Sequence, residues 1–271
     1  MLYYEDDEWQ DGQYPAIMAV GDSWFWYPHN NILSAIIKNP GLLDGYKNIQ
    51  ALGHNGALLQ DYVGAGKYAS YVDNSLSVAN HHYFNTFMIS GAGNDAVQYG
   101  LALKPDCSAI SNPKLCISPD GINKFLRTIA IALGSLIYHI QHVYKDDPPQ
   151  SRPIFIHGYD YPVPDGRSFN IGELPIVGPW LKPALDHSKV NTDLTFRTAV
   201  IKELIDQLNT LLQSFASADN SVVYIDSRGT LNSGAGYQND WANELHPTPS
   251  GFSKIVSQCW MPALKKWKRA R

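Results

Sequence analysis

Short apolar runs that end in a glycine or another turn residue, separated by stretches with helical spacing, constrain this chain more than any other feature. Five runs predict buried strands at 16–20, 48–52, 84–90, 153–157 and 222–226. Apolar residues at helical spacing predict helices at 31–38, 121–144, 197–217 and 249–265, and a helix start near 57–62. Strands that alternate with helices form a parallel sheet with helices on both faces. We therefore expect a three-layer α/β/α sandwich with a mainly parallel five-stranded sheet.

The domain organisation follows from what interrupts this alternation. The 271 residues contain no repeat, no low-complexity tract and no long linker, which predicts one domain over 1–271. Hydrophobic residues make up 44% of the chain, enough for one substantial core. Two segments, at about 96–120 and 158–190, do not fit the alternation and each follows a predicted strand. We expect both insertions to lie over the ligand-binding edge of the sheet and to determine substrate choice.

Charge and hydropathy argue against several classes of partner. The formal net charge of -4 gives no electrostatic reason to expect binding to nucleic acid. No stretch reaches the roughly 18 apolar residues of a membrane-spanning helix, so we expect no integral membrane segment. The acidic, polar N-terminus lacks the features of a secretion signal, which favours the cytoplasm. A signal peptide removed before this sequence begins stays an open alternative.

The three cysteines do not form a metal or redox motif. Cys107 and Cys116 lie nine residues apart in a loop-like stretch, so a local disulfide between them is an open expectation. Cys259 is expected in the core near the last helix. No CxxC spacing is present, and we expect neither a metal nor a cofactor.

Polar turn residues follow three of the predicted strands and precede the last helix. In parallel sheets, ligands bind outside the carboxyl ends of the strands. The first three strands are followed by Gly21-Asp22-Ser23-Trp24, Gly53-His54-Asn55-Gly56 and Gly91-Ala92-Gly93-Asn94-Asp95. A fourth block, Asn243-Glu244-Leu245-His246-Pro247, follows the fifth strand. Together they supply a nucleophile, a base and hydrogen-bond donors, which acyl transfer requires.

With these four blocks in this order over nearly the whole chain, the sequence resembles the SGNH hydrolases, also called the GDSL family of esterases and lipases. The resemblance implies that Ser23 is the nucleophile and His246 its general base. It also implies an oxyanion hole formed by the backbone N–H groups of Ser23 and Gly56 and by the side-chain amide of Asn94.

The residue that orients the base departs from the family pattern. Three residues before His246 the family usually has Asp, and this chain has Asn243. An asparagine can orient the imidazole through its amide oxygen, as in papain-like enzymes, although it supplies no negative charge. Glu244 and Asp240 are nearby carboxylates and remain alternatives to Asn243 for this role.

Smaller departures and the aromatic residues bear on the substrate. Trp24 stands where the family usually has Leu, and Ala92 where it usually has Gly. Trp24, His54 and Tyr159 are expected to line the substrate site, because each lies at or just after a predicted strand end.

These expectations combine into a function. The sequence predicts a serine esterase that hydrolyses a small-molecule carboxylic ester, an acyl ester of a lipid or a carbohydrate, through an acyl-enzyme intermediate. Two alternatives stay open: a non-catalytic domain of the same fold that binds a glycan or a lipid, and an acyltransferase of that fold.

Overall fold

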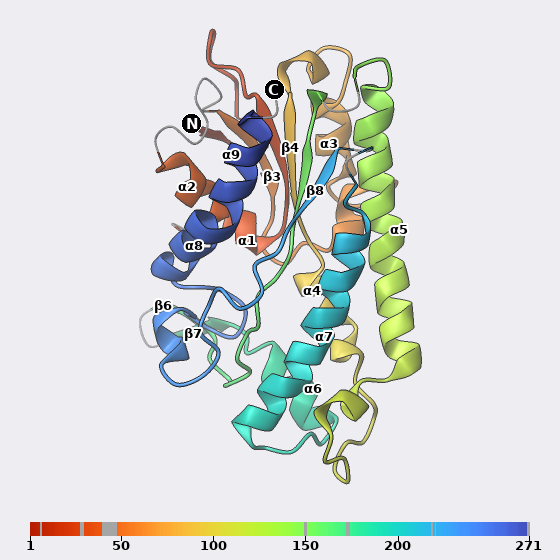
Figure 1. The fold of residues 1–271 in the computed structure, drawn as a ribbon, viewed down its shortest axis with the longest axis vertical. Coiled ribbons are helices and arrows are strands. Elements are labelled where there is room, and N and C mark those ends of the chain that lie inside the picture. Colours follow the sequence, from red (N-terminus) through yellow and green to blue (C-terminus); the bar gives the residue numbers. More distant parts are fainter. Residues whose placement is uncertain are drawn as a thin grey trace.

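The computed structural model describes residues 1–5, 7–27, 30–39, 48–148, 151–171, 174–217, 219 and 221–269. Six parallel strands form the main sheet, in the order β1-β3-β2-β4-β5-β8 (Figure 1). Their bounds are Leu2–Tyr3 (β1), Ile17–Gly21 (β2), Ile49–Gly53 (β3), Thr86–Ser90 (β4), Ile154–His157 (β5) and Val222–Ile225 (β8). The predicted parallel α/β/α sandwich is confirmed, with all five predicted strands present and one strand more than expected.

The additional strand is β1, at the edge of the sheet. It pairs with β3 through two residues, Leu2 with Ile49 and Tyr3 with Gln50. A strand of two residues has no periodicity to detect, and it lies in a segment that is otherwise polar and acidic. The prediction of five strands was therefore wrong by this one edge strand.

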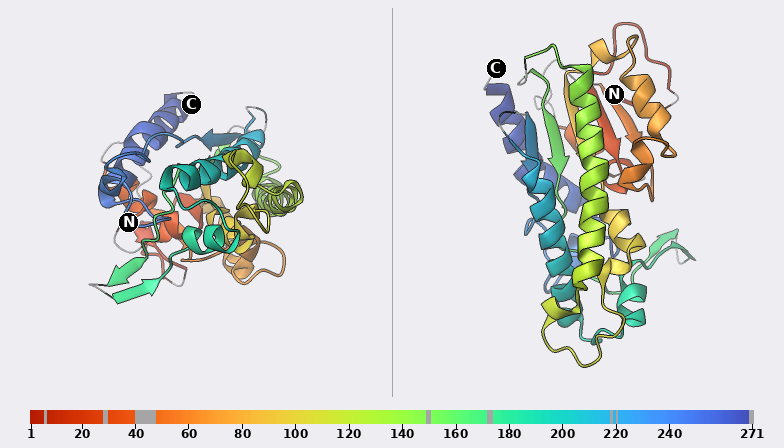
Figure 2. Two further views of the ribbon diagram at one scale, coloured as in Figure 1. Left: turned by 90° about the horizontal axis from the view of Figure 1, so that it is seen from below. Right: turned by 90° about the vertical axis from the view of Figure 1, so that its right-hand side faces the viewer.

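Helices cover both faces of the sheet. One face carries α2 (Ile32–Ile37), α8 (Pro249–Ile255) and α9 (Met261–Arg269), as Figures 1 and 2 show. The other carries α3 (Ala69–Ser75), α5 (Pro119–Val143) and α7 (Leu194–Ser214).

The sequence encodes where several of these helices begin and end. The side chains of Ser118, Asp193 and Thr248 each accept one backbone N–H in the first turn of α5, α7 and α8. The predicted helix 249–265 is interrupted by a π-helical turn at Val256–Trp260. The predicted start near 57–62 is a 3-10 helix, Leu59–Tyr62, and α3 begins only at Ala69.

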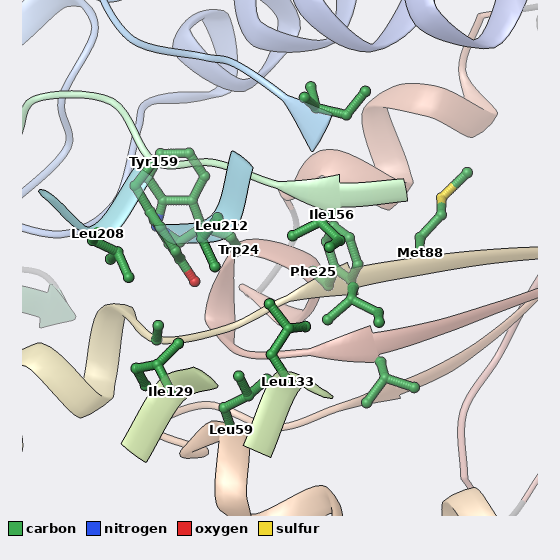
Figure 3. Close-up of a cluster of buried hydrophobic side chains, with 14 of the residues drawn as sticks. Trp24, Phe25, Leu59, Met88, Ile129, Leu133, Ile156, Tyr159, Leu208 and Leu212 are labelled. Carbon is green, nitrogen blue, oxygen red and sulfur yellow. The ribbon is translucent and has the colours of Figure 1, made fainter. Parts of the chain in front are cut away.

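The core explains why the strands read as uninterrupted apolar runs. Strand β2 lies in the middle of the sheet with helices on both sides, and every one of its residues is buried. Figure 3 shows part of this core, where Ile129 and Leu133 of α5 and Leu208 and Leu212 of α7 face the sheet.

Both predicted insertions contain short elements beyond the carboxyl ends of the strands (Figure 1). Segment 96–120 contains 3-10 helices at Gly100–Ala102 and Pro113–Cys116. Segment 158–190 contains α6 (Leu181–His187) and an antiparallel pair, β6 (Phe169–Ile171) and β7 (Leu174–Val177). No helix in the described part of the chain is both long and apolar enough to cross a membrane.

The disulfide that the sequence left open is not formed. Cys107 and Cys116 are both buried free thiols, and the Cys107 Sγ lies 3.7 Å from the backbone oxygen of Cys116. Cys259 is also free and only half-buried, so its expected place in the core was partly wrong; its Sγ lies 3.2 Å from the Thr230 hydroxyl.

Candidate active site

The first block places Ser23 at the carboxyl end of β2. The chain turns at Gly21, where a Cβ would lie 2.5 Å from the backbone oxygen of Ser90 on the adjacent strand. The Asp22 carboxylate then accepts the N–H of Trp24 and caps the short helix α1 (Ser23–Trp26). Strands β2 and β4 are neighbours although β3 separates them in sequence, so Ser23 lies where the strand order reverses. Ligands bind at that point in open α/β sheets.

Ser23 and His246 meet although they are 223 residues apart. The Ser23 Oγ lies 2.8 Å from the His246 Nε2, and both residues are buried. On the other side of the ring, His246 Nδ1 lies 2.9 Å from the amide oxygen of Asn243. The structure thus brings the three predicted residues into one hydrogen-bonded chain.

The hydrogen bonds around Asn243 determine which ring nitrogen carries the proton. Its Oδ1 also accepts the backbone N–H groups of Leu245 and His246, at 3.0 and 2.9 Å. Because two donors already face this atom, it must be the amide oxygen, and the imidazole Nδ1 must donate to it. His246 Nε2 is then unprotonated and accepts the Ser23 hydroxyl, which is the tautomer that a general base requires.

Two aromatic rings enclose the imidazole. Tyr27 stacks on His246 with ring centroids 4.2 Å apart and planes at 14°, and Trp180 meets the ring edge-on at 5.5 Å. The Asn243 amide nitrogen donates to the Tyr27 hydroxyl oxygen at 3.3 Å. Burial lowers the pKa of His246 to about 3, so its neutral form is the stable one at neutral pH.

The two alternative carboxylates are engaged elsewhere. Glu244 is fully buried and accepts four backbone N–H groups, those of Gly166, Trp180, Leu181 and Lys182. It thereby ties the start of α6 to the loop that carries His246. Asp240 accepts the N–H of Asn232 and pairs with Lys254 at 2.6 Å. Of the three candidates, Asn243 is therefore the one whose side chain meets the imidazole.

Asn94 links the second and third blocks. Its side-chain nitrogen donates to the backbone oxygen of Ala57 at 3.0 Å, next to the turn at Gly56. Gly56 has φ +79°, a left-handed conformation that glycine adopts without steric cost. Ala92 has φ +100°, so the alanine that replaces the family's usual glycine occupies a conformation that glycine prefers. Gly56 and Asn94 stay predictions as donors to an oxyanion.

Asp22 and Tyr159 form a buried polar cluster next to Ser23. The Tyr159 hydroxyl donates to Asp22 at 2.5 Å, and the Ser90 hydroxyl donates to the same carboxylate at 3.1 Å. Desolvation raises the pKa of Asp22, while these hydrogen bonds oppose the shift. The hydroxyl of Tyr159 therefore supports the turn of Ser23, while its ring lines the pocket described next.

Two hollows of different character lie near Ser23. A half-open, mainly apolar pocket, here called the inner pocket, has Ser23 and Asn94 in its wall together with apolar side chains. Those side chains include Trp24, Leu101, Leu181, Ile201, Leu204 and Ile205. A wider and more polar hollow, the outer hollow, is lined by Tyr27, Arg167, Ser168, Asn170 and Asn243.

The three residues expected to contact substrate have different places. Trp24 is almost fully buried, and its indole N–H donates to the backbone oxygen of Leu245 beside His246. His54 lies 2.5 Å from the carboxylate of Glu5 and stacks on Tyr68, and it lines neither hollow.

Among the residues that the structure describes, no group of three His, Cys, Asp or Glu residues is arranged to hold a metal.

Tyr27 is the residue at this site whose role was not foreseen. It belongs to the aromatic run 24–27, but its contacts with His246 and Asn243 join segments more than 200 residues apart. The available signal was its position four residues after Ser23, because residues at that spacing share one face of a helical turn.

No family model matches the sequence, and no curated protein matches it with significance. Two solved structures are similar over most of the chain. A Streptococcus pneumonia protein, named as a candidate platelet activating factor, is 17% identical with a TM-score of 0.50 and covers 95% of this chain and 85% of its own. An acetyl esterase, solved as a serine-to-alanine variant with an acetate ion, is 14% identical with a TM-score of 0.50 and covers 95% and 100%. At these identities the likeness shows the fold.

Proposed function

We propose that this chain, which has the α/β/α fold of the SGNH hydrolases, is a one-domain serine esterase that hydrolyses carboxylic esters through an acyl-enzyme. One observation carries the proposal: the buried chain of hydrogen bonds from Ser23 through His246 to Asn243, with distances of 2.8 and 2.9 Å. A nucleophile, its base and a group that orients the base are the parts that nucleophilic acyl transfer needs.

The reaction proceeds in two halves. The Ser23 oxygen attacks the ester carbonyl carbon while His246 Nε2 takes the hydroxyl proton. The bond between the carbonyl carbon and the alcohol oxygen then breaks, and His246 returns the proton to the departing alcohol. In the second half, a water attacks the acyl-enzyme, His246 takes its proton, and Ser23 leaves with that proton as the carboxylic acid is released. The N–H groups of Ser23 and Gly56 and the Asn94 amide hold the oxyanion in both halves.

The imidazolium that forms in each half has no carboxylate beside it. The Asn243 amide oxygen offers a dipole, and the face of Tyr27, 4.2 Å away, offers a cation–π contact. The Tyr27 hydroxyl, as acceptor for the amide nitrogen, keeps that dipole pointing at the ring.

Hydrolysis of p-nitrophenyl acetate tests the proposal. We expect Ser23→Ala to lower kcat by about 10³-fold or more while circular dichroism stays unchanged. Ser253→Ala, on the exposed side of α8, is the matched control and should keep full activity. Full activity in Ser23→Ala would refute the mechanism.

A fluorophosphonate probe separates the enzyme from a non-catalytic binding domain of the same fold. We expect the probe to label the wild type at Ser23 and to leave Ser23→Ala unlabelled. A folded wild type that does not react would favour the binding domain, for which the missing charge at Asn243 is the argument.

A further inference from the structure

The inner pocket begins at the reacting atoms. Ser23 and Asn94 lie in its wall, so a group bound there is next to the nucleophile and the expected oxyanion donor. The wall also includes Ile201, Leu204 and Ile205, three consecutive inward positions of α7. The pocket is therefore placed to hold one of the two halves of an ester.

The position of the base decides which half that is. The leaving alcohol must lie where His246 can return a proton to its oxygen, within hydrogen-bond reach of Nε2. The inner pocket is lined by Ser23 and Asn94 but not by His246, whereas the outer hollow is open and polar and borders Tyr27, whose ring stacks on the imidazole. The alcohol half therefore fits outside the inner pocket, on the side of the imidazole, and the acyl half, which stays bonded to Ser23, fits the inner pocket.

The two carboxylates in the wall of the inner pocket already have protein partners. Asp22 accepts from Trp24, Ser90 and Tyr159. The Asp160 carboxylate accepts the backbone N–H groups of Tyr161, Gly229 and Leu231. Beyond Ser23, Asn94 and Trp241, whose buried indole N–H has no hydrogen-bond partner among the described residues, the wall offers a bound group mainly apolar surface. This favours a hydrocarbon chain over one with several hydroxyl groups.

The size of the pocket limits the length of that chain. Its cavity volume is about 40 Å³, and one water-sized group needs roughly 10–15 Å³. About three carbon atoms beyond the carbonyl therefore fit. The wall on α7 does not readily yield, because Ile201 and Leu204 are each only 1% exposed and the same helix continues into the core through Leu208 and Leu212 (Figure 3).

We propose that the inner pocket is the acyl site and that Leu204 and its neighbours restrict the substrate to short, unsubstituted acyl groups, from acetyl to about butyryl. This inference rests on the proposed function, since it assigns the two halves of an ester around Ser23.

A series of p-nitrophenyl esters from acetate to octanoate tests the assignment. We expect the kcat/KM of the wild type to fall by at least about tenfold between butyrate and hexanoate. Leu204→Ala should raise the hexanoate-to-acetate ratio by about tenfold, because it enlarges the pocket at its α7 wall. Leu212→Ala, which removes the same atoms from the same buried face of α7 two turns away, is the matched control and should keep the wild-type ratio.

A second variant acts in the opposite direction. Ala96→Val adds two methyl groups to the wall from α4 (Gly93–Gln98) and should lower the butyrate-to-acetate ratio. Equal turnover of acetate and octanoate by the wild type, or equal ratios in Leu204→Ala and Leu212→Ala, would overturn the acyl-site assignment while Ser23-dependent hydrolysis stands. If the wild type hydrolyses none of these esters in a Ser23-dependent way, the proposed function itself is overturned.

Discussion

Replacing Asn243 by aspartate tests whether His246 works as a base without a negative charge beside it. The aspartate fits the site, because one oxygen keeps the N–H groups of Leu245 and His246 and the imidazole Nδ1–H. The other oxygen replaces the amide nitrogen, and the Tyr27 hydroxyl, now 3.3 Å from that nitrogen, can turn and donate to it. Asn243→Asp therefore changes the charge beside His246 with little change in shape.

The expected shift follows from the distance. Opposite unit charges 2.9 Å apart attract by about 6 kcal/mol at an effective dielectric constant of about 20. That attraction favours the imidazolium and raises the pKa of His246 by about four units, from about 3 towards 7. If half of the positive charge has developed on His246 in the transition state, kcat/KM of Asn243→Asp on its pH plateau is about 100-fold higher than that of the wild type.

The pH at which activity is lost separates the wild type from Asn243→Asp. Only neutral imidazole acts as a base, so activity is full above the pKa of His246 and is lost as pH falls through it. We expect the wild type to keep its activity down to about pH 4, given a pKa of about 3. The variant should begin to lose activity near pH 7, and the two curves should cross near about pH 5.

Profiles of kcat/KM for p-nitrophenyl acetate between pH 3 and 9 measure both limbs. Asn74→Asp, which makes the same charge change at an exposed position of α3, is the matched control and should follow the wild type. A fall in kcat/KM near pH 6 or 7 in the wild type, or the same acid profile in Asn243→Asp as in the wild type, would refute the view that His246 has no negative charge beside it because of Asn243.

Three further substitutions probe residues around the site. Tyr27→Phe keeps the stacked ring but removes the acceptor of the Asn243 amide, so steady-state kinetics should show kcat lowered about tenfold with KM unchanged; an equal loss in KM would point to substrate contact instead. Glu244→Gln removes the charge that faces four backbone N–H groups, and urea titration should show the free energy of unfolding lowered by about 2 kcal/mol. An unchanged midpoint and slope would contradict this. Burial lowers the pKa of His157 to about 3, so the stability it supports is full above pH 6.5 and falls as the pH drops towards 3. His157→Phe should therefore lose about 3 kcal/mol less than the wild type between pH 7 and 4, and equal losses would contradict the buried neutral ring.

The sheet could be predicted because its strands are buried on both faces. Runs such as Ile17–Gly21 contain no polar residue, and each ends at a glycine or another turn residue, so their bounds can be recognised in the sequence. The start of α8 was readable because a capping side chain, Thr248, precedes a proline. The same pattern stands at Ser118, but the predicted start at 121 lies two residues after the observed start of α5 at Pro119. The edge strand β1 was not readable, because two residues carry no pattern.

The contacts that distinguish similar residues at the site could not be predicted. Asn243 and Glu244 are adjacent, and nothing local says which meets His246. The difference is made by four N–H groups that reach Glu244 from residues 62 to 78 positions earlier in the chain. Likewise, the spacing of Cys107 and Cys116 allowed a disulfide, whereas the fold leaves both as free thiols. The size of the inner pocket depends on α7 and α4 approaching each other, which spacing does not give.

The hydrogen bonds of Glu244 connect the wall of the inner pocket to the segment that carries His246. The Glu244 carboxylate accepts the N–H of Leu181, which lines the inner pocket, and Glu244 lies two residues before His246. Any displacement of α6 that made room for a larger acyl group would pull the imidazole away from Ser23. Divergence towards new substrates is therefore expected to proceed by changing side chains on α7, while the backbone of α6 stays fixed across active descendants.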